Sequence, residues 1–120
     1  MTPSSRSIRA FLLVEAAGFG VAASIHGGVL MSGFEHRQAT IAESIIATVL
    51  VVGIVASLAR PALTRWLGIT AQSFALLGTL VGIFTIIIGI GPRTVPDVLY
   101  HVGIVIVLVC GLVVAARTRP

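Results

Sequence analysis

Ionisable side chains are scarce in this sequence, and most of them fall in two short stretches. The chain has three histidines and four acidic residues. All three histidines and three of the acids lie in the stretches SIHGGVLMSGFEHRQATIAES and PDVLYH. They are, in chain order, His26, Glu35, His36, Glu43, Asp97 and His101. Imidazole and carboxylate groups bind transition metals and transfer protons, so either chemistry is open to this set.

A transition-metal centre is the first chemistry that these residues predict. Two imidazoles with one or two carboxylates form a mixed nitrogen and oxygen ligand set, which suits zinc, iron, manganese or copper. The predicted ligands are His26, His101, Glu43 and Asp97. Three further side chains would act around them as hydrogen-bond partners or proton donors: Glu35, His36 and Tyr100. The corresponding function is redox chemistry or metal handling, and catalysis at the bound ion stays open.

A b-type haem is the second chemistry that fits, because it needs only two well-placed histidines. His26 and His101 would be its axial ligands. Their expected depths agree, since a rise of about 1.5 Å per residue puts each roughly 8–10 Å inside the outer end of its helix. The two imidazoles are therefore expected to face each other across the core of a bundle.

Glu43 and Asp97 also have a purely structural interpretation. The segments TIAE, from Thr40, and TVPD, from Thr94, each place a threonine three residues before an acid. This spacing is typical of a capping box at the start of a helix. Each acid is therefore expected either to cap its helix or to serve the site.

Glu15 stands apart from the cluster, deep in the first apolar run. It lies eleven residues before His26, which is close to three helical turns, so both side chains share one helix face. Gln72 is expected at a similar depth and within hydrogen-bonding reach. An acid inside a membrane usually has a partner or a function. Glu15 is thus a candidate proton-binding group, and a proton-coupled small transporter is an alternative function.

Composition places all these residues in a membrane protein. The 120-residue chain is 57% hydrophobic and only 10% charged, whereas soluble domains carry about 25% charged residues. At roughly 20 residues per crossing, four spans use the whole chain as one domain, 1–120. The predicted spans are 8–31, 40–59, 67–90 and 96–116. Short connections predict an all-α, up-down four-helix bundle in which the first and last helices are neighbours.

The arginines predict the orientation. Six of the eight basic residues fall at the two termini and in the second connection, and two fall in the other connections. By the positive-inside rule, both termini are cytoplasmic and the histidines and nearby acids lie toward the outer face of the inner (plasma) membrane. This distribution accounts for the net charge of +4 without a nucleic-acid partner.

A GxxxG motif, Gly78 to Gly82, lies in the third predicted span. Small residues at this spacing let helices approach closely. The motif favours tight packing within the protomer, a homodimer seam, or docking to a larger membrane complex. A role as an accessory subunit of such a complex is the third predicted function. The lipid bilayer is the predicted partner in every case.

The position of Glu15 carries one family resemblance. A chain of this size with four spans and a glutamate in VEAAG near the start of the first span resembles, in outline, the small multidrug resistance transporters. The resemblance implies a proton- and drug-binding glutamate and a working dimer. It covers the first span and the span count. The sequence departs from the family in its third span, AQSFALLGTLVGIFTIII, which lacks tyrosine and tryptophan, and in the outer histidines.

Overall fold

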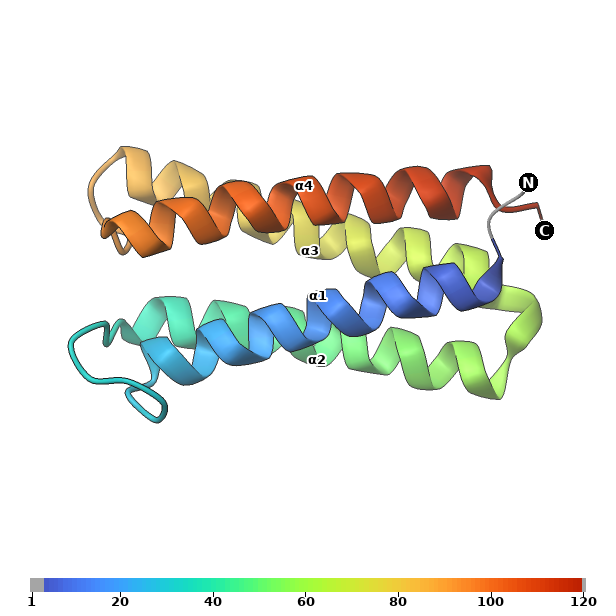
Figure 1. Ribbon diagram of the computed structural model, residues 1–120, viewed down its shortest axis with the longest axis horizontal. Helices are drawn as coiled ribbons and strands as arrows, with labels where there is room; N and C mark the ends of the chain where they lie inside the picture. The colour runs from blue at the N-terminus through green and yellow to red at the C-terminus, as the bar shows by residue number, and fades with distance from the viewer. Residues whose placement is uncertain (1–3, 120) are drawn as a thin grey trace.

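Four long α-helices make up most of the molecule (Figure 1). The computed structural model describes residues 4–119. Its helices are α1 (Ser5–His26), α2 (Arg37–Ala59), α3 (Thr64–Ile87) and α4 (Val95–Arg117), with a short 3₁₀ helix η1 (Pro61–Leu63) before α3. All four long helices are long and apolar enough to cross a membrane. The prediction of an all-helical protein with four membrane-spanning segments is confirmed to that extent.

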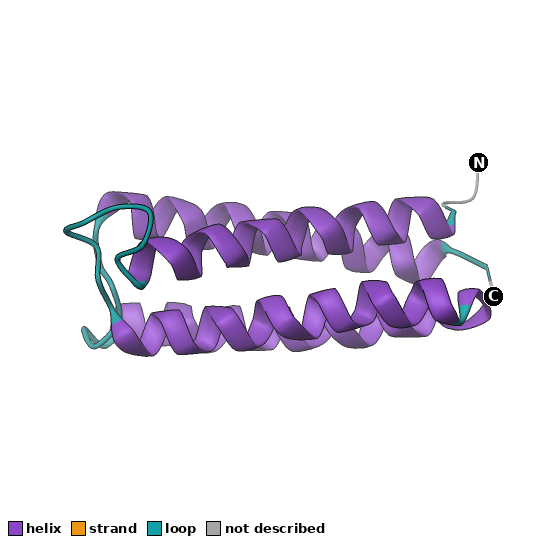
Figure 2. Ribbon diagram, turned by 90° about the horizontal axis from the view of Figure 1, so that it is seen from below, coloured by secondary structure: helices purple, strands orange, loops and turns teal. Residues whose placement is uncertain are grey.

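The helices lie along one common axis and form a bundle 44 Å long. The start of α1 and the end of α4 lie at the same end as η1, which we call the terminal end (Figure 1). The connections 27–36 and 88–94 lie at the opposite end, which we call the loop end, and Figure 2 shows these loops beside one another. The helix α1 packs against α2, α3 and α4, so the expected contact between the first and last helices is confirmed.

A narrow seam along each helix forms the core. In α4 the buried residues recur at spacings of four and three: Asp97, His101, Ile104, Leu108, Gly111 and Ala115. These spacings average 3.6 residues, the period of an α-helix, and keep one stripe of α4 toward its neighbours. Leu12, Leu50 and Leu108 are fully buried at the centre. Large apolar side chains on the other faces are exposed, as expected for helices that contact lipid.

The first helix ends five residues earlier than the sequence predicted. The chain reverses at Gly27 and Gly28, and Gly28 has φ = +75°, a conformation that glycine adopts without a steric penalty. The carbonyl of Ser24 then accepts from the N–H groups of Val29 and Leu30 at 2.9 and 3.2 Å. His26 is consequently the last residue of α1. The sequence had predicted it a turn or more inside the helix, and that prediction is wrong.

The glycines of the GxxxG motif face the interior of the protomer. A Cβ added to Gly78 would lie 2.8 Å from Cδ1 of Ile46 in α2, and one added to Gly82 would lie 3.2 Å from Nε2 of His101 in α4. Both glycines therefore allow α3 to approach its own neighbours. An intermolecular interface at this motif stays a prediction.

Candidate functional site

His26 lies between two acids at the loop end of the bundle. Its Nδ1 is 2.7 Å from Oε2 of Glu43 on α2, and its Nε2 is 2.8 Å from Oδ1 of Asp97 on α4. All three residues are buried, with 4%, 5% and 7% of their surface exposed. We call His26, Glu43 and Asp97 the loop-end cluster. It joins the α1–α2 hairpin to the first turn of α4.

Asp97 combines the two roles that the sequence offered as alternatives. Its Oδ2 accepts from the backbone N–H of Thr94 at 3.1 Å and from the Thr94 hydroxyl, while its own N–H donates to Thr94 Oγ1 at 3.3 Å. The predicted capping box at the start of α4 is confirmed. Its other oxygen, Oδ1, is left to bind His26. The cap thus fixes the carboxylate that meets the imidazole.

Replacing Thr94 by valine is expected to lower the free energy of unfolding by about 1–2 kcal/mol, because an N-cap and a hydrogen bond to Asp97 are lost together. Equilibrium unfolding in mixed micelles measures the change. Thr48→Val is the matched control, since Thr48 is exposed and its hydroxyl bonds only to the carbonyl of Ser44 within α2. Equal costs for the two variants would contradict a special role for Thr94.

Glu43 does not cap α2, contrary to the capping-box interpretation of Thr40 and Glu43. The helix starts three residues earlier, and its N-cap is His36, whose Nδ1 accepts from the N–H of Ala39 at 3.1 Å. The other ring nitrogen of His36 donates to the carbonyl of Ile90 at 3.2 Å and so joins the two loops. Glu43 is therefore nearly two turns inside α2 and has no capping function.

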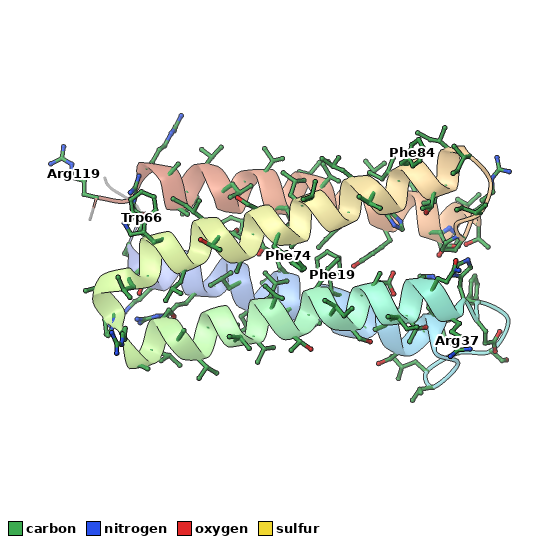
Figure 3. All side chains as sticks on the ribbon, turned by 180° about the vertical axis from the view of Figure 1, so that it is seen from behind. Phe19, Arg37, Trp66, Phe74, Phe84 and Arg119 are labelled. Carbon is green, nitrogen blue, oxygen red and sulfur yellow. The ribbon has the colours of Figure 1, made fainter. Side chains whose placement is uncertain are left out.

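His101 and Tyr100 flank the cluster. His101 Nδ1 donates to the backbone carbonyl of Asp97 at 2.7 Å, so both imidazoles bind Asp97, one at its main chain and the other at its side chain. Tyr100 packs edge-on against His101 and against Phe19, which points into the space between the two hairpins (Figure 3). The Tyr100 hydroxyl is buried and has no hydrogen-bond partner within residues 4–119.

The two ring nitrogens of His26, one of which would have to bind the metal ion or haem iron, already have partners. Both of them are within hydrogen-bond distance of a carboxylate, so ligation of a metal ion or haem iron would require His26 to release an acid. Among residues 4–119, no group of three or more histidine, cysteine, aspartate or glutamate side chains is placed to hold a metal ion. Metal or haem binding stays a prediction.

Two other predicted site residues lie outside the cluster. Glu35 is exposed in the loop after α1, where its Oε2 accepts from the N–H of Gly33 at 2.9 Å. Glu15 is wholly buried in the terminal half of the bundle, on the same face of α1 as His26. Glu15 and the loop-end cluster are thus two separate buried acidic centres. Along α1, Glu15 and His26 are eleven residues apart, or roughly 16 Å.

Two cavities adjoin the cluster from different sides. The larger, about 520 Å³, lies between α1, the loop that follows it and the start of α4. Its walls are mainly apolar, with Ile25, Met31 and Phe34 among them, and His26 and Asp97 lie at its polar end. The smaller, about 200 Å³, lies between α2, α3 and α4 and includes Glu43 and His101. Tyr100 lines both.

The cavity walls are the part of the site that the sequence did not predict. Met31 and Phe34 belong to a loop that the sequence assigned partly to the first span. Pro96, the first residue of the last predicted span, also lines the larger cavity. The sequence signal for these walls is the presence of apolar residues, Met31 and Phe34, next to a membrane helix. Contact with lipid explains such residues equally well, so the signal does not indicate a cavity.

The chain has no significant match among protein-family models, curated proteins or solved structures. Its function therefore has to be inferred from the geometry of its own residues.

The hydrogen bonds of the loop-end cluster limit the protonation states that it can adopt. Each of the two N···O contacts of His26 holds one hydrogen. A neutral imidazole has a single N–H, so the cluster is either an imidazolium between two carboxylates or a neutral imidazole with one protonated acid. Its net charge is −1 in both cases when no further proton is bound to a carboxyl oxygen outside these two contacts. Within residues 4–119 no arginine forms an ion pair with either acid, so this charge is uncompensated.

Proposed function

We propose that this protein is a proton-linked membrane carrier of a small organic cation, and that the proton and the cation compete for the loop-end cluster. One observation supports it above all: a single imidazole lies between two buried carboxylates. A buried net charge of −1 is costly in a low-dielectric environment. Either one more proton or one bound cation removes that cost, and the two exclude each other.

The larger cavity supports the choice of an organic cation. Its volume of about 520 Å³ lies within the range of small-molecule sites, roughly 300–1,000 Å³. Apolar walls favour a hydrophobic body, and the end that carries Asp97 favours a positive charge. Tyr100 adds an aromatic ring, which attracts organic cations. A strongly hydrated inorganic ion would gain little from such walls.

The orientation proposed for the carrier places both termini in the cytoplasm and the loop end toward the outer face of the plasma membrane. Arg119 and Trp66 lie at the terminal end and Arg37 at the loop end (Figure 3). The arginine excess at the terminal end and the interfacial tryptophan support this orientation. The cluster would then exchange its ligands with the outer side.

Binding of benzyltrimethylammonium to the purified protein tests the proposal, because this cation keeps its charge at every pH. Its affinity is expected to rise with pH, by up to about tenfold per unit, since one proton leaves the cluster for each cation bound. The neighbouring titratable groups are His101, Tyr100 and His36. Asp97→Asn removes the uncompensated charge and is expected to abolish binding. Isothermal titration calorimetry measures both effects.

Two controls accompany this measurement. Neopentylbenzene has the shape of the probe without its charge and should bind with no pH dependence. Glu35→Gln removes an exposed acid at the same end and should bind the cation as the wild type does. Unchanged affinity in Asp97→Asn would overturn the proposal. So would stoichiometric metal or a haem absorption band in the purified protein, either of which would favour the metal or haem prediction.

A further inference from the structure

A second polar pair lies in the terminal half of the bundle, away from the loop-end cluster. Glu15 of α1 and Gln72 of α3 are both fully buried. They meet beside Gly111 of α4: a Cβ added to this glycine would lie 2.7 Å from Glu15 Oε1 and 3.0 Å from Gln72 Cδ. Three helices therefore bring a carboxyl group and an amide together inside the core.

The orientation of the amide is set by a hydrogen bond on its far side. Gln72 Nε2 donates to the carbonyl of Gly68 at 3.0 Å, one turn earlier in α3. Its Oε1 is thereby left on the side of Glu15. Neither Gln72 Oε1 nor either carboxyl oxygen of Glu15 has a hydrogen-bond partner within residues 4–119. An unpartnered buried polar atom costs about 1–3 kcal/mol, so three together need an explanation.

We propose that Glu15 and Gln72 form a second proton-binding site, in which the protonated carboxyl group of Glu15 donates to Gln72 Oε1. An ionised Glu15 has only acceptor atoms and would repel the amide oxygen. One proton removes the buried charge and supplies the donor that the pair lacks. The site is distinct from the loop-end cluster and does not depend on which cation that cluster binds.

Nearby cations offer Glu15 no other partner. Arg9 is engaged with the last turn of α2: Nε donates to Ser57 Oγ at 3.0 Å and Nη2 to the Ser57 carbonyl at 2.7 Å. Arg65 donates to the carbonyl of Ala116 at 3.4 Å and its guanidinium lies over the Trp66 ring. No ion pair in residues 4–119 involves Glu15. A proton is the ligand that this pair can accept without rearrangement of an arginine.

Infrared difference spectroscopy of the reconstituted protein tests the assignment. The spectrum of the wild type minus that of Glu15→Gln, at neutral pH, is expected to show the carbonyl stretch of a protonated carboxyl group. Glutamine at position 15 is nearly isosteric and can also donate to Gln72, so this variant should fold. In Gln72→Leu the band should move to higher frequency, because the hydrogen bond is lost.

The exposed acid Glu35 is the matched control. Wild type minus Glu35→Gln should show carboxylate stretches at neutral pH. Carboxylate stretches in place of the carbonyl band for Glu15, with or without added sodium, would overturn the proposal, as would a band unaffected by Gln72→Leu. Benzyltrimethylammonium binding, measured on the same samples, should persist in Glu15→Gln, so failure of this inference is distinguishable from failure of the proposed function.

Discussion

Replacing His26 by alanine is expected to lower the free energy of unfolding by about 3–5 kcal/mol, which is the usual cost of removing one partner of a buried ion pair. The reason is the position of the imidazole between Glu43 and Asp97, at 2.7 and 2.8 Å. Without it, two buried acids share one pocket with no donor between them. The α1–α2 hairpin also loses its polar link to the start of α4.

A mutant cycle separates this effect from the loss of packing. His26→Ala is compared in the wild type and in a Glu43→Gln, Asp97→Asn background, by equilibrium unfolding in mixed micelles. In the neutral background the substitution should cost clearly less, because no buried charge is left unpaired. Equal costs in both backgrounds would mean that the imidazole stabilises the bundle only through van der Waals contacts.

The parts of the fold that the sequence predicted correctly depend on local patterns. Long apolar runs predict the four helices, and the Thr94–Asp97 spacing predicts a cap that involves those two residues alone. Short connections also predict that α1 contacts α4, because few arrangements of four linked helices exist. The helices and the cap are determined by residues close together in the chain, whereas the contact between α1 and α4 follows from the lengths of the connections.

The errors at the loop end arose where two local signals compete. The run from Ile8 to Met31 is mainly apolar, yet Gly27 and Gly28 end α1 because Gly28 adopts a positive φ. Thr40 has the spacing of a capping residue, yet the side chain of His36 caps α2 one turn earlier. Hydrophobicity and spacing do not decide between such signals, whereas the contact of His36 with Ile90 does.

The structure brings together three of the four residues predicted as ligands, in an arrangement that the sequence did not predict. Burial of His26, Glu43 and Asp97 follows from their positions on the inner faces of three helices. Which nitrogen meets which oxygen depends on side-chain rotamers and on tertiary distances, and these have no signature in the sequence. The larger cavity likewise depends on how far α1 and α4 separate at the loop end.

The two buried acidic centres differ in what surrounds them, and this difference separates their proposed roles. The loop-end cluster adjoins two cavities, so a ligand can reach it. Glu15 has no exposed surface and adjoins neither cavity. A proton is small enough to reach such a site through brief openings of the helix packing, and an organic cation is not.

Gly111→Ala is expected to lower the free energy of unfolding by about 1–3 kcal/mol, the usual cost of overpacking a close-packed core. The added Cβ would overlap the Gln72 amide and lie 2.7 Å from Glu15 Oε1. To make room, Gln72 has to turn and give up its bond to Gly68. The infrared band of Glu15 should therefore shift in the same variant, since the amide oxygen moves with it.

The matched control for this substitution is Gly103→Ala, on the same helix. A Cβ at Gly103 meets nothing within 4 Å, so it should cost nothing or stabilise α4 slightly through its better helix propensity. In a Gln72→Ala background the overlap with the amide is removed and only the 2.7 Å contact with Glu15 Oε1 remains, so Gly111→Ala should cost clearly less than in the wild type. If Gly111→Ala cost as much in that background as in the wild type, Gln72 would not occupy the space beside Gly111. The acid–amide pair would then lose the contact on which its assignment depends.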